Sequence, residues 1–173
     1  MCTFVHLSGT NAPLARGVVG LDEGSSILEN QPVILVVEDD LEVQIIIEDA
    51  LGEGGFEPAI AASGEEALTL LKGNKGRYRA LVADISLRGR MSGWEVATKA
   101  REIDPGFPVL YVTGAYAHQW TLRGVPNSAL LTKPFNPPQL VAAVSQLLTP
   151  TSRCRPDHKE GNEIIFPPIK MRT

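Results

Sequence analysis

Residues 33–40 read Val33-Ile34-Leu35-Val36-Val37-Glu38-Asp39-Asp40. The first five residues form a continuous apolar run rich in β-branched side chains, which is typical of a central strand buried on both faces of a parallel sheet. The acids that follow mark the point where this strand ends. The stretch therefore predicts carboxyl groups at the edge of the sheet where open α/β proteins bind their ligands.

The same pattern repeats along the chain, because short apolar runs alternate with amphipathic segments between residues 32 and 149. We predict strands at Val33–Val37, Glu57–Ala61, Ala80–Ala83, Pro108–Val112 and Ala129–Thr132. The helix after the first strand is expected to bury a stripe made of Val43, Ile46, Ile47, Ala50 and Leu51. Five such β-α units predict a doubly wound α/β domain with a five-stranded parallel sheet.

Capping signals mark the starts of the later helices. Ser63 and Ser92 each precede a glutamate by three residues, and Asn136 directly precedes a proline. The weakly patterned residues 115–124 predict a short helix before the last strand.

The two ends of the chain differ from its middle. Residues 1–31 mix Gly, Ser, Asn and Pro without a sustained period, and we interpret them as a flexible N-terminal extension. Residues 150–173 are expected to be a tail too short for an output domain. Cys2 and Cys154 lie in these ends without metal-site spacing, which predicts reduced bystander thiols.

Composition narrows the functional classes. The chain has 173 residues, of which 43% are hydrophobic and 21% charged, and its formal net charge is −4. Binding a phosphate backbone needs clustered Lys and Arg, so a nucleic-acid partner is not expected. No apolar stretch is long enough for a membrane span and no secretory signal is present, which predicts a soluble, cytoplasmic protein without a membrane partner.

Polar residues follow four of the predicted strands: Glu38 and Asp39, then Asp84, Thr113 and Lys133. The carboxyl ends of parallel strands share one edge, so these side chains are expected to converge. Crowded carboxylates repel one another without a cation, which predicts a Mg²⁺ site. Such a site suits phosphoryl transfer, in which Asp84 is the nucleophile, Asp39 binds the ion directly and Glu38 binds it through water. Lys133 would add a cationic contact and Thr113 a hydrogen bond.

A set of motifs occurs here in a characteristic order: Glu38-Asp39-Asp40, Asp84, Gly93, Thr113-Gly114 and Lys133-Pro134-Phe135. With these motifs, residues 32–149 resemble the receiver domain of two-component response regulators. The resemblance implies a flavodoxin-like (β/α)5 fold with strand order 2-1-3-4-5. It also implies a regulatory phosphoacceptor, not an enzyme, that catalyses only its own phosphorylation and dephosphorylation.

By this resemblance Asp84 is the phosphoacceptor, and Glu38 and Asp39 are the acidic pair for Mg²⁺. The backbone carbonyl of Ser86 completes the protein ligands. The implied phosphoryl donor is a sensor histidine kinase or a histidine phosphotransfer protein. A homodimer through the fourth helix, fifth strand and fifth helix is a further expected assembly.

The switch residues of the family are only partly present. Thr113 matches the switch hydroxyl, and the Lys133–Pro134 bond resembles the family's cis peptide. The aromatic switch position, three residues before the lysine, is Leu130 here, which implies either a weaker signal or one relayed by another surface. Tyr116 is a candidate substitute.

The loop after Asp84 also departs from the family. Arg88 stands where many relatives carry proline, and one extra residue precedes Gly93. Arg88 and Arg90 either attract a phosphorylated partner or are only solvated. Trp120 likewise fits either a partner contact or a cover over the core.

Three functions from different classes remain open. The leading hypothesis is a stand-alone response regulator that signals by protein–protein contact. The second is a receiver-like scaffold that does not need phosphorylation, which Leu130 motivates. The third is a Mg²⁺-dependent phosphatase with an aspartyl nucleophile, but such enzymes usually carry a second acid two residues later, where this sequence has Ser86.

Overall fold

Strands and helices alternate along residues 31–149, the part of the chain that the computed structural model describes. The strands are β1 (Val33–Val37), β2 (Glu57–Ala61), β3 (Tyr78–Asp84), β4 (Val109–Thr113) and β5 (Ala129–Thr132). The helices are α1 (Leu41–Glu53), α2 (Gly64–Gly73), α3 (Gly93–Ile103), α4 (Trp120–Arg123) and α5 (Pro137–Leu148), with a 3-10 turn, η2 (Ala117–Gln119), before α4. The predictions for the two ends of the chain fall on residues outside this part.

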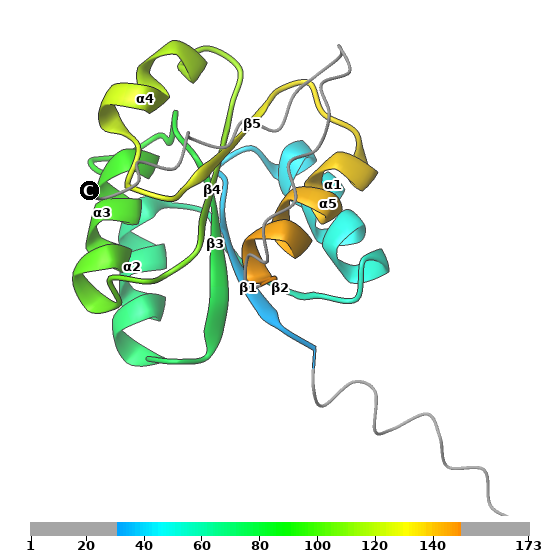
Figure 1. The fold of residues 1–173 in the computed structure, drawn as a ribbon, viewed down its shortest axis with the longest axis horizontal. Helices are drawn as coiled ribbons and strands as arrows, with labels where there is room; N and C mark the ends of the chain where they lie inside the picture. Colours follow the sequence, from blue (N-terminus) through cyan, green and yellow to red (C-terminus); the bar gives the residue numbers. More distant parts are fainter. Residues whose placement is uncertain (1–30, 150–173) are drawn as a thin grey trace, which may run out of the picture. The chain divides into compact units, whose positions relative to one another are not determined.

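The strands form one parallel sheet in the order β2-β1-β3-β4-β5. Helices α2, α3 and α4 cover one face, and α1 and α5 cover the other (Figure 1). The predicted doubly wound fold and its strand order are therefore confirmed. Within residues 31–149, no helix combines the length and the apolar character that a membrane span requires.

A hydrophobic core lies on each face of the sheet. Along β1, Leu35 and Val37 point into the core beneath α2 and α3, while Ile34 and Val36 point into the core beneath α1 and α5. All four side chains are fully buried. The continuous apolar run thus reflects burial on both faces, as parallel sheets require.

Helix α1 buries the predicted stripe except for Ile46. Ile47 and Leu51 are buried as expected, but Ile46 is 48% exposed and Gln44 takes a buried position. Residues 44, 47 and 51 share one face of a helix. The Gln44 amide donates to the backbone carbonyl of Glu38 at 2.5 Å, so a polar side chain is satisfied there. The prediction for Ile46 was wrong because the buried face is centred on residues 44, 47 and 51, and Ile46 lies at its margin.

The predicted helix starts are confirmed by their hydrogen bonds. The Ser63 hydroxyl accepts the N–H of Glu66 at 3.2 Å. The carboxylate of Glu95 accepts both the N–H and the hydroxyl of Ser92, each at 2.9 Å. Asn136 caps α5 in the same reciprocal manner with the residue three positions later. These caps fix where the loops at the sheet edge give way to helix.

Candidate functional site

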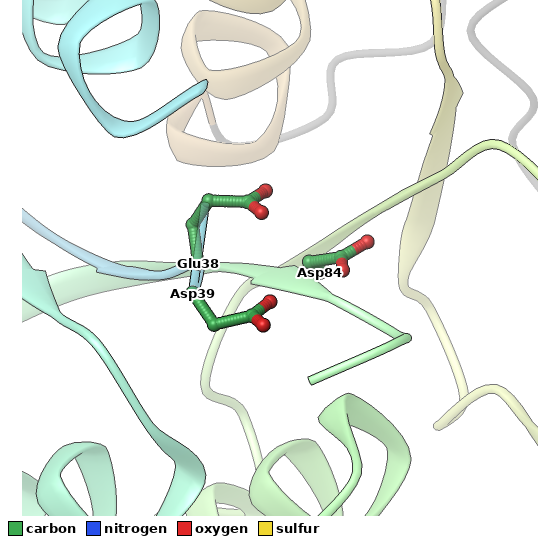
Figure 2. A group of neighbouring side chains, drawn as sticks. All are labelled: Glu38, Asp39 and Asp84. Carbon is green, nitrogen blue, oxygen red and sulfur yellow. The ribbon is translucent and has the colours of Figure 1, made fainter. Parts of the chain in front are cut away.

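The register of the sheet brings three acids together. Val37 pairs with Ala83, so Glu38 and Asp39, just past the end of β1, lie beside Asp84 at the end of β3. One carboxylate oxygen from each acid lies within 4.8 Å of the others. Figure 2 shows Glu38 and Asp39 leaving the chain in opposite directions, with both carboxylates bent toward the side of the view on which Asp84 lies. We call this group the acidic pocket.

Lys133 faces the buried side of the acidic pocket. Its Nζ lies 2.7 Å from Oε2 of Glu38 and 3.5 Å from Oδ1 of Asp84. Glu38 is only 1% exposed and Asp84 only 6%. We call the Lys133–Glu38 contact the inner pair. The ammonium thus lies close to two of the predicted site carboxylates.

Burial makes both inner carboxylates reluctant to ionise. Desolvation raises the pKa of Glu38, and the charge of Asp84 adds to the rise, while Lys133 opposes it. Desolvation likewise raises the pKa of Asp84, against the charge of Lys133 and the N–H groups of Ser86 and Ile85. One lysine therefore compensates only part of the negative charge, and a further cation would be stabilised here.

A second cation lies on the open side of the acidic pocket. Nε of Arg88 is 3.1 Å from Oδ2 of Asp39, and the Arg88 backbone N–H donates to the same oxygen at 3.3 Å. We call the Arg88–Asp39 contact the outer pair. The sequence predicts for Arg88 either attraction of a phosphorylated partner or simple solvation, and neither includes this ion pair. The departure from proline at this position was the only available signal.

Ser86 and Thr113, the remaining predicted site residues, lie at neighbouring strand ends. The Ser86 N–H donates to Oδ2 of Asp84 at 3.2 Å. Thr113 is fully buried at the end of β4, and its hydroxyl accepts the N–H of Tyr116 at 3.2 Å. The carbonyl of Thr113 accepts the N–H of Lys133 at 2.8 Å, and the Lys133–Pro134 bond is cis as predicted.

Gly93 is required by a close backbone approach. A Cβ atom at this position would collide with the backbone carbonyl of Asp84. The Gly93 N–H also donates to the carbonyl of Ile85 at 3.3 Å. Only glycine permits α3 to begin so close to the strand that carries Asp84.

The aromatic residues near the switch position are mostly buried. Leu130 is fully buried and pairs in register with Tyr111, whose ring centroid lies 4.6 Å from that of Trp94. Trp120 is 5% exposed and its indole N–H donates to the hydroxyl of Ser128 at 3.0 Å. Of the two interpretations of Trp120, this burial favours a cover over the core.

Fold and pocket together define a class of protein: a doubly wound α/β domain whose acidic pocket of Glu38, Asp39 and Asp84 is typical of a phosphoacceptor site. The family model of the response regulator receiver domain matches residues 34–145. The chain therefore belongs to the receiver domain family of two-component signalling.

Relatives of known structure share this architecture. A response regulator receiver protein from Sinorhizobium medicae is 38% identical with a TM-score of 0.66, and the match covers 69% of this chain and 96% of that one. A CheY-like receiver domain protein from Methanospirillum hungatei is 27% identical with a TM-score of 0.60, covering 69% and 94%.

Curated relatives are longer. The transcriptional regulatory protein TcrA from Mycobacterium tuberculosis is 33% identical over 142 residues, which are 81% of this chain and 55% of that protein. The chain thus spans about half the length of this curated relative.

Proposed function

We propose that this chain is a stand-alone response regulator that accepts a phosphoryl group on Asp84 and signals by protein–protein contact. The observation that carries this proposal is the position of the Asp84 carboxylate, buried among two acids and a lysine at a strand end. Two receiver proteins of known structure match this chain over nearly their whole length, which supports a receiver function for residues 31–149.

The acidic pocket fits a Mg²⁺ ion. Three carboxylates each place an oxygen within 4.8 Å of the others, and burial raises the pKa of Glu38 and Asp84. In our proposal Asp39, Asp84 and the carbonyl of Ser86 hold the ion directly, and Glu38 holds it through water. When bound, Mg²⁺ would neutralise charge on the carboxylate and on the phosphoryl oxygens.

Asp84 is the nucleophile of the proposed transfer. A carboxylate oxygen of Asp84 forms a bond to phosphorus while the phosphorus–nitrogen bond of a donor phosphohistidine breaks, and the imidazole nitrogen keeps the electron pair. Lys133, already 3.5 Å from Asp84, offers an ammonium to the incoming phosphoryl oxygens. The hydroxyl of Thr113 would turn from the N–H of Tyr116 to donate a hydrogen bond to the same group.

Receiver domains pair with histidine kinases, and we propose a sensor histidine kinase or a histidine phosphotransfer protein as the donor here. An apolar surface begins next to the acidic pocket: Leu41, Ile45 and Ile46 on α1 are 71%, 58% and 48% exposed. A donor that delivers phosphate to Asp84 would cover this surface.

Leu122 on α4, 88% exposed, supports the proposed homodimer through α4, β5 and α5. A cytoplasmic location would fit these partners.

A scaffold that needs no phosphate is the second candidate, and the buried Leu130 favours it. A leucine packed in the core has no aromatic ring that could turn inward when the hydroxyl of Thr113 moves. The acidic pocket argues against a pure scaffold, because burial raises the pKa of Glu38 and Asp84 and a scaffold has no use for carboxyl groups that are costly to ionise. The phosphatase alternative lacks its second acid, since the exposed Ser86 stands in that place.

Incubation with acetyl phosphate and Mg²⁺, followed by intact-protein mass spectrometry, tests the proposal. We expect one added phosphoryl group on the wild type and none on Asp84→Asn. Asp40→Asn is the matched control, because Asp40 caps α1 by accepting the N–H of Glu42 at 2.9 Å and asparagine keeps that cap. Equal labelling of Asp84→Asn and the wild type would refute the assignment, and Mg²⁺-dependent beryllofluoride binding would exclude the pure scaffold.

A further inference from the structure

The loop between β3 and α3, residues 85–92, is tied to its surroundings at two places. Arg88 contacts Asp39 through both its side chain and its backbone, as described above. The N–H of Arg90 donates to Oε1 of Glu65 on α2 at 3.1 Å. Gly89, between the two arginines, has a φ of +148° and also lies beside the Glu65 carboxylate. The loop is thus positioned at the mouth of the acidic pocket.

The Arg88 and Arg90 contacts differ in the carboxylate that each one engages. Glu65 lies outside the acidic pocket, so the Arg90 contact only positions the loop. Asp39 belongs to the acidic pocket, and the Arg88 guanidinium lies against one of its carboxylate oxygens. A positive group therefore already stands at a carboxylate that a divalent cation would need.

We propose that Arg88 competes with the divalent cation for Asp39 and that its guanidinium leaves when the ion binds. This inference rests on the proposed Mg²⁺ site. Two positive groups on one carboxylate repel each other at close range, so the more weakly held one is displaced. The Arg88 side chain is 85% exposed and can move into water at little cost, unlike Lys133, which is 25% exposed and bonded to a buried acid.

Competition by Arg88 sets the metal affinity of the acidic pocket. The metal-free form keeps Asp39 partly neutralised, which lowers the gain from binding the ion. The Arg90–Glu65 contact does not involve the acidic pocket and holds the loop in place in both states. Only the Arg88 side chain needs to change position.

Calorimetric titration of Mg²⁺ into the full chain tests the competition. Arg88→Ala is expected to bind Mg²⁺ about two- to fivefold more tightly than the wild type, the range expected for loss of one exposed ion pair. Arg90→Ala is the matched control, because it removes the same charge from the same loop without touching Asp39. Arg90→Ala is expected to change the Mg²⁺ affinity by less than half as much as Arg88→Ala does. Equal effects of the two substitutions would overturn the proposal.

An NMR titration of the wild type gives a second readout. The Nε–H resonance of Arg88 should shift with the same midpoint as the backbone amide of Asp39. An Arg88 signal that stays fixed while Asp39 responds would also overturn the proposal. If neither protein binds Mg²⁺, the proposed metal site fails along with it; if Arg88→Ala and the wild type bind equally, only the competition fails.

Discussion

The inner pair and the outer pair are both ion pairs, but the lysine of the inner pair is largely buried and the arginine of the outer pair is largely exposed. In the inner pair, the side chains of Lys133 and Glu38 are 25% and 2% exposed, and their atoms are 2.7 Å apart. In the outer pair, the side chains of Arg88 and Asp39 are 85% and 13% exposed, at 3.1 Å. Both cations flank the same acidic pocket. Water surrounds Arg88 in the outer pair but hardly reaches Glu38 in the inner pair.

The difference in exposure separates a permanent contact from an exchangeable one. Removing one partner of a buried pair leaves an uncompensated charge in a poorly solvated place, which is costly. An exposed pair is screened and contributes little to stability. The acidic pocket thus combines a structural cation, Lys133, with an exposed one, Arg88, that we propose a metal ion displaces.

Breaking the inner pair should have the largest effect on stability. Lys133→Met leaves Glu38 and Asp84 facing each other without the ammonium, and we expect the free energy of unfolding at pH 7 without Mg²⁺ to fall by about 2 kcal/mol. Arg88→Met, which removes the cation of the outer pair, should change it by less than about 0.5 kcal/mol. Urea unfolding followed by circular dichroism measures both. Equal losses would contradict the distinction between the pairs.

The pH dependence checks the cause of the Lys133 effect. The pKa values of Glu38 and Asp84 are raised in the folded state above their ordinary values of 4.5 and 3.8. Between the ordinary and the raised pKa values, the folded protein therefore binds more protons than the unfolded chain. Without Mg²⁺, these two groups make the protein more stable as the pH falls through this range. Lys133→Met removes a charge that lowers both pKa values and widens the range. The gap between variant and wild type should shrink as the pH is lowered from 7 towards 5, and a constant gap would point to lost packing instead.

Gln44 supports both pairs, because its side-chain amide donates to the backbone carbonyl of Glu38. This carbonyl lies in the segment that carries Glu38 of the inner pair and Asp39 of the outer pair. Gln44→Met keeps the size of the side chain but leaves that carbonyl without its donor, which should cost about 1–2 kcal/mol in unfolding free energy. Mg²⁺ affinity should fall as well, because the carboxylates of Glu38 and Asp39 lose their fixed position. Glu48→Met, on the exposed side of α1, is the control and should stay within about 0.5 kcal/mol. An unchanged metal affinity in Gln44→Met would show that the amide serves stability alone.

The fold was predictable because it depends on signals that are local in sequence. The apolar run before Glu38 and the capping serines Ser63 and Ser92 each act within a few residues. Their order along the chain then allows only a small number of parallel sheets. The gathering of Glu38, Asp39 and Asp84 at one edge follows from that sheet.

The features that sequence reasoning missed depend on contacts between segments. Gln44 is buried although polar, because a loop carbonyl happens to lie within its reach. Ile46, two positions further along α1, points away from the face that Gln44 shares with Ile47 and Leu51 and is 48% exposed. Arg88 reaches Asp39 across 49 positions of sequence, a contact that no periodicity encodes. These are the residues that distinguish this acidic pocket from a generic one.

Salt should affect the outer pair selectively, and this is the smallest effect we expect. Screening shortens the range of exposed charge interactions from about 30 Å at 0.01 M to about 3 Å at 1 M ionic strength. The tighter Mg²⁺ binding of Arg88→Ala relative to the wild type should therefore shrink to less than about 1.5-fold in 1 M KCl. Titrations of both proteins at low and high KCl measure this ratio, in which the general effect of salt on Mg²⁺ binding cancels. The stability gap of Lys133→Met should persist at high salt, because burial shields the inner pair from counterions. If the affinity ratio for Arg88→Ala also persisted, the outer pair would have to act by fixing the conformation of the loop, not by the charge of its guanidinium.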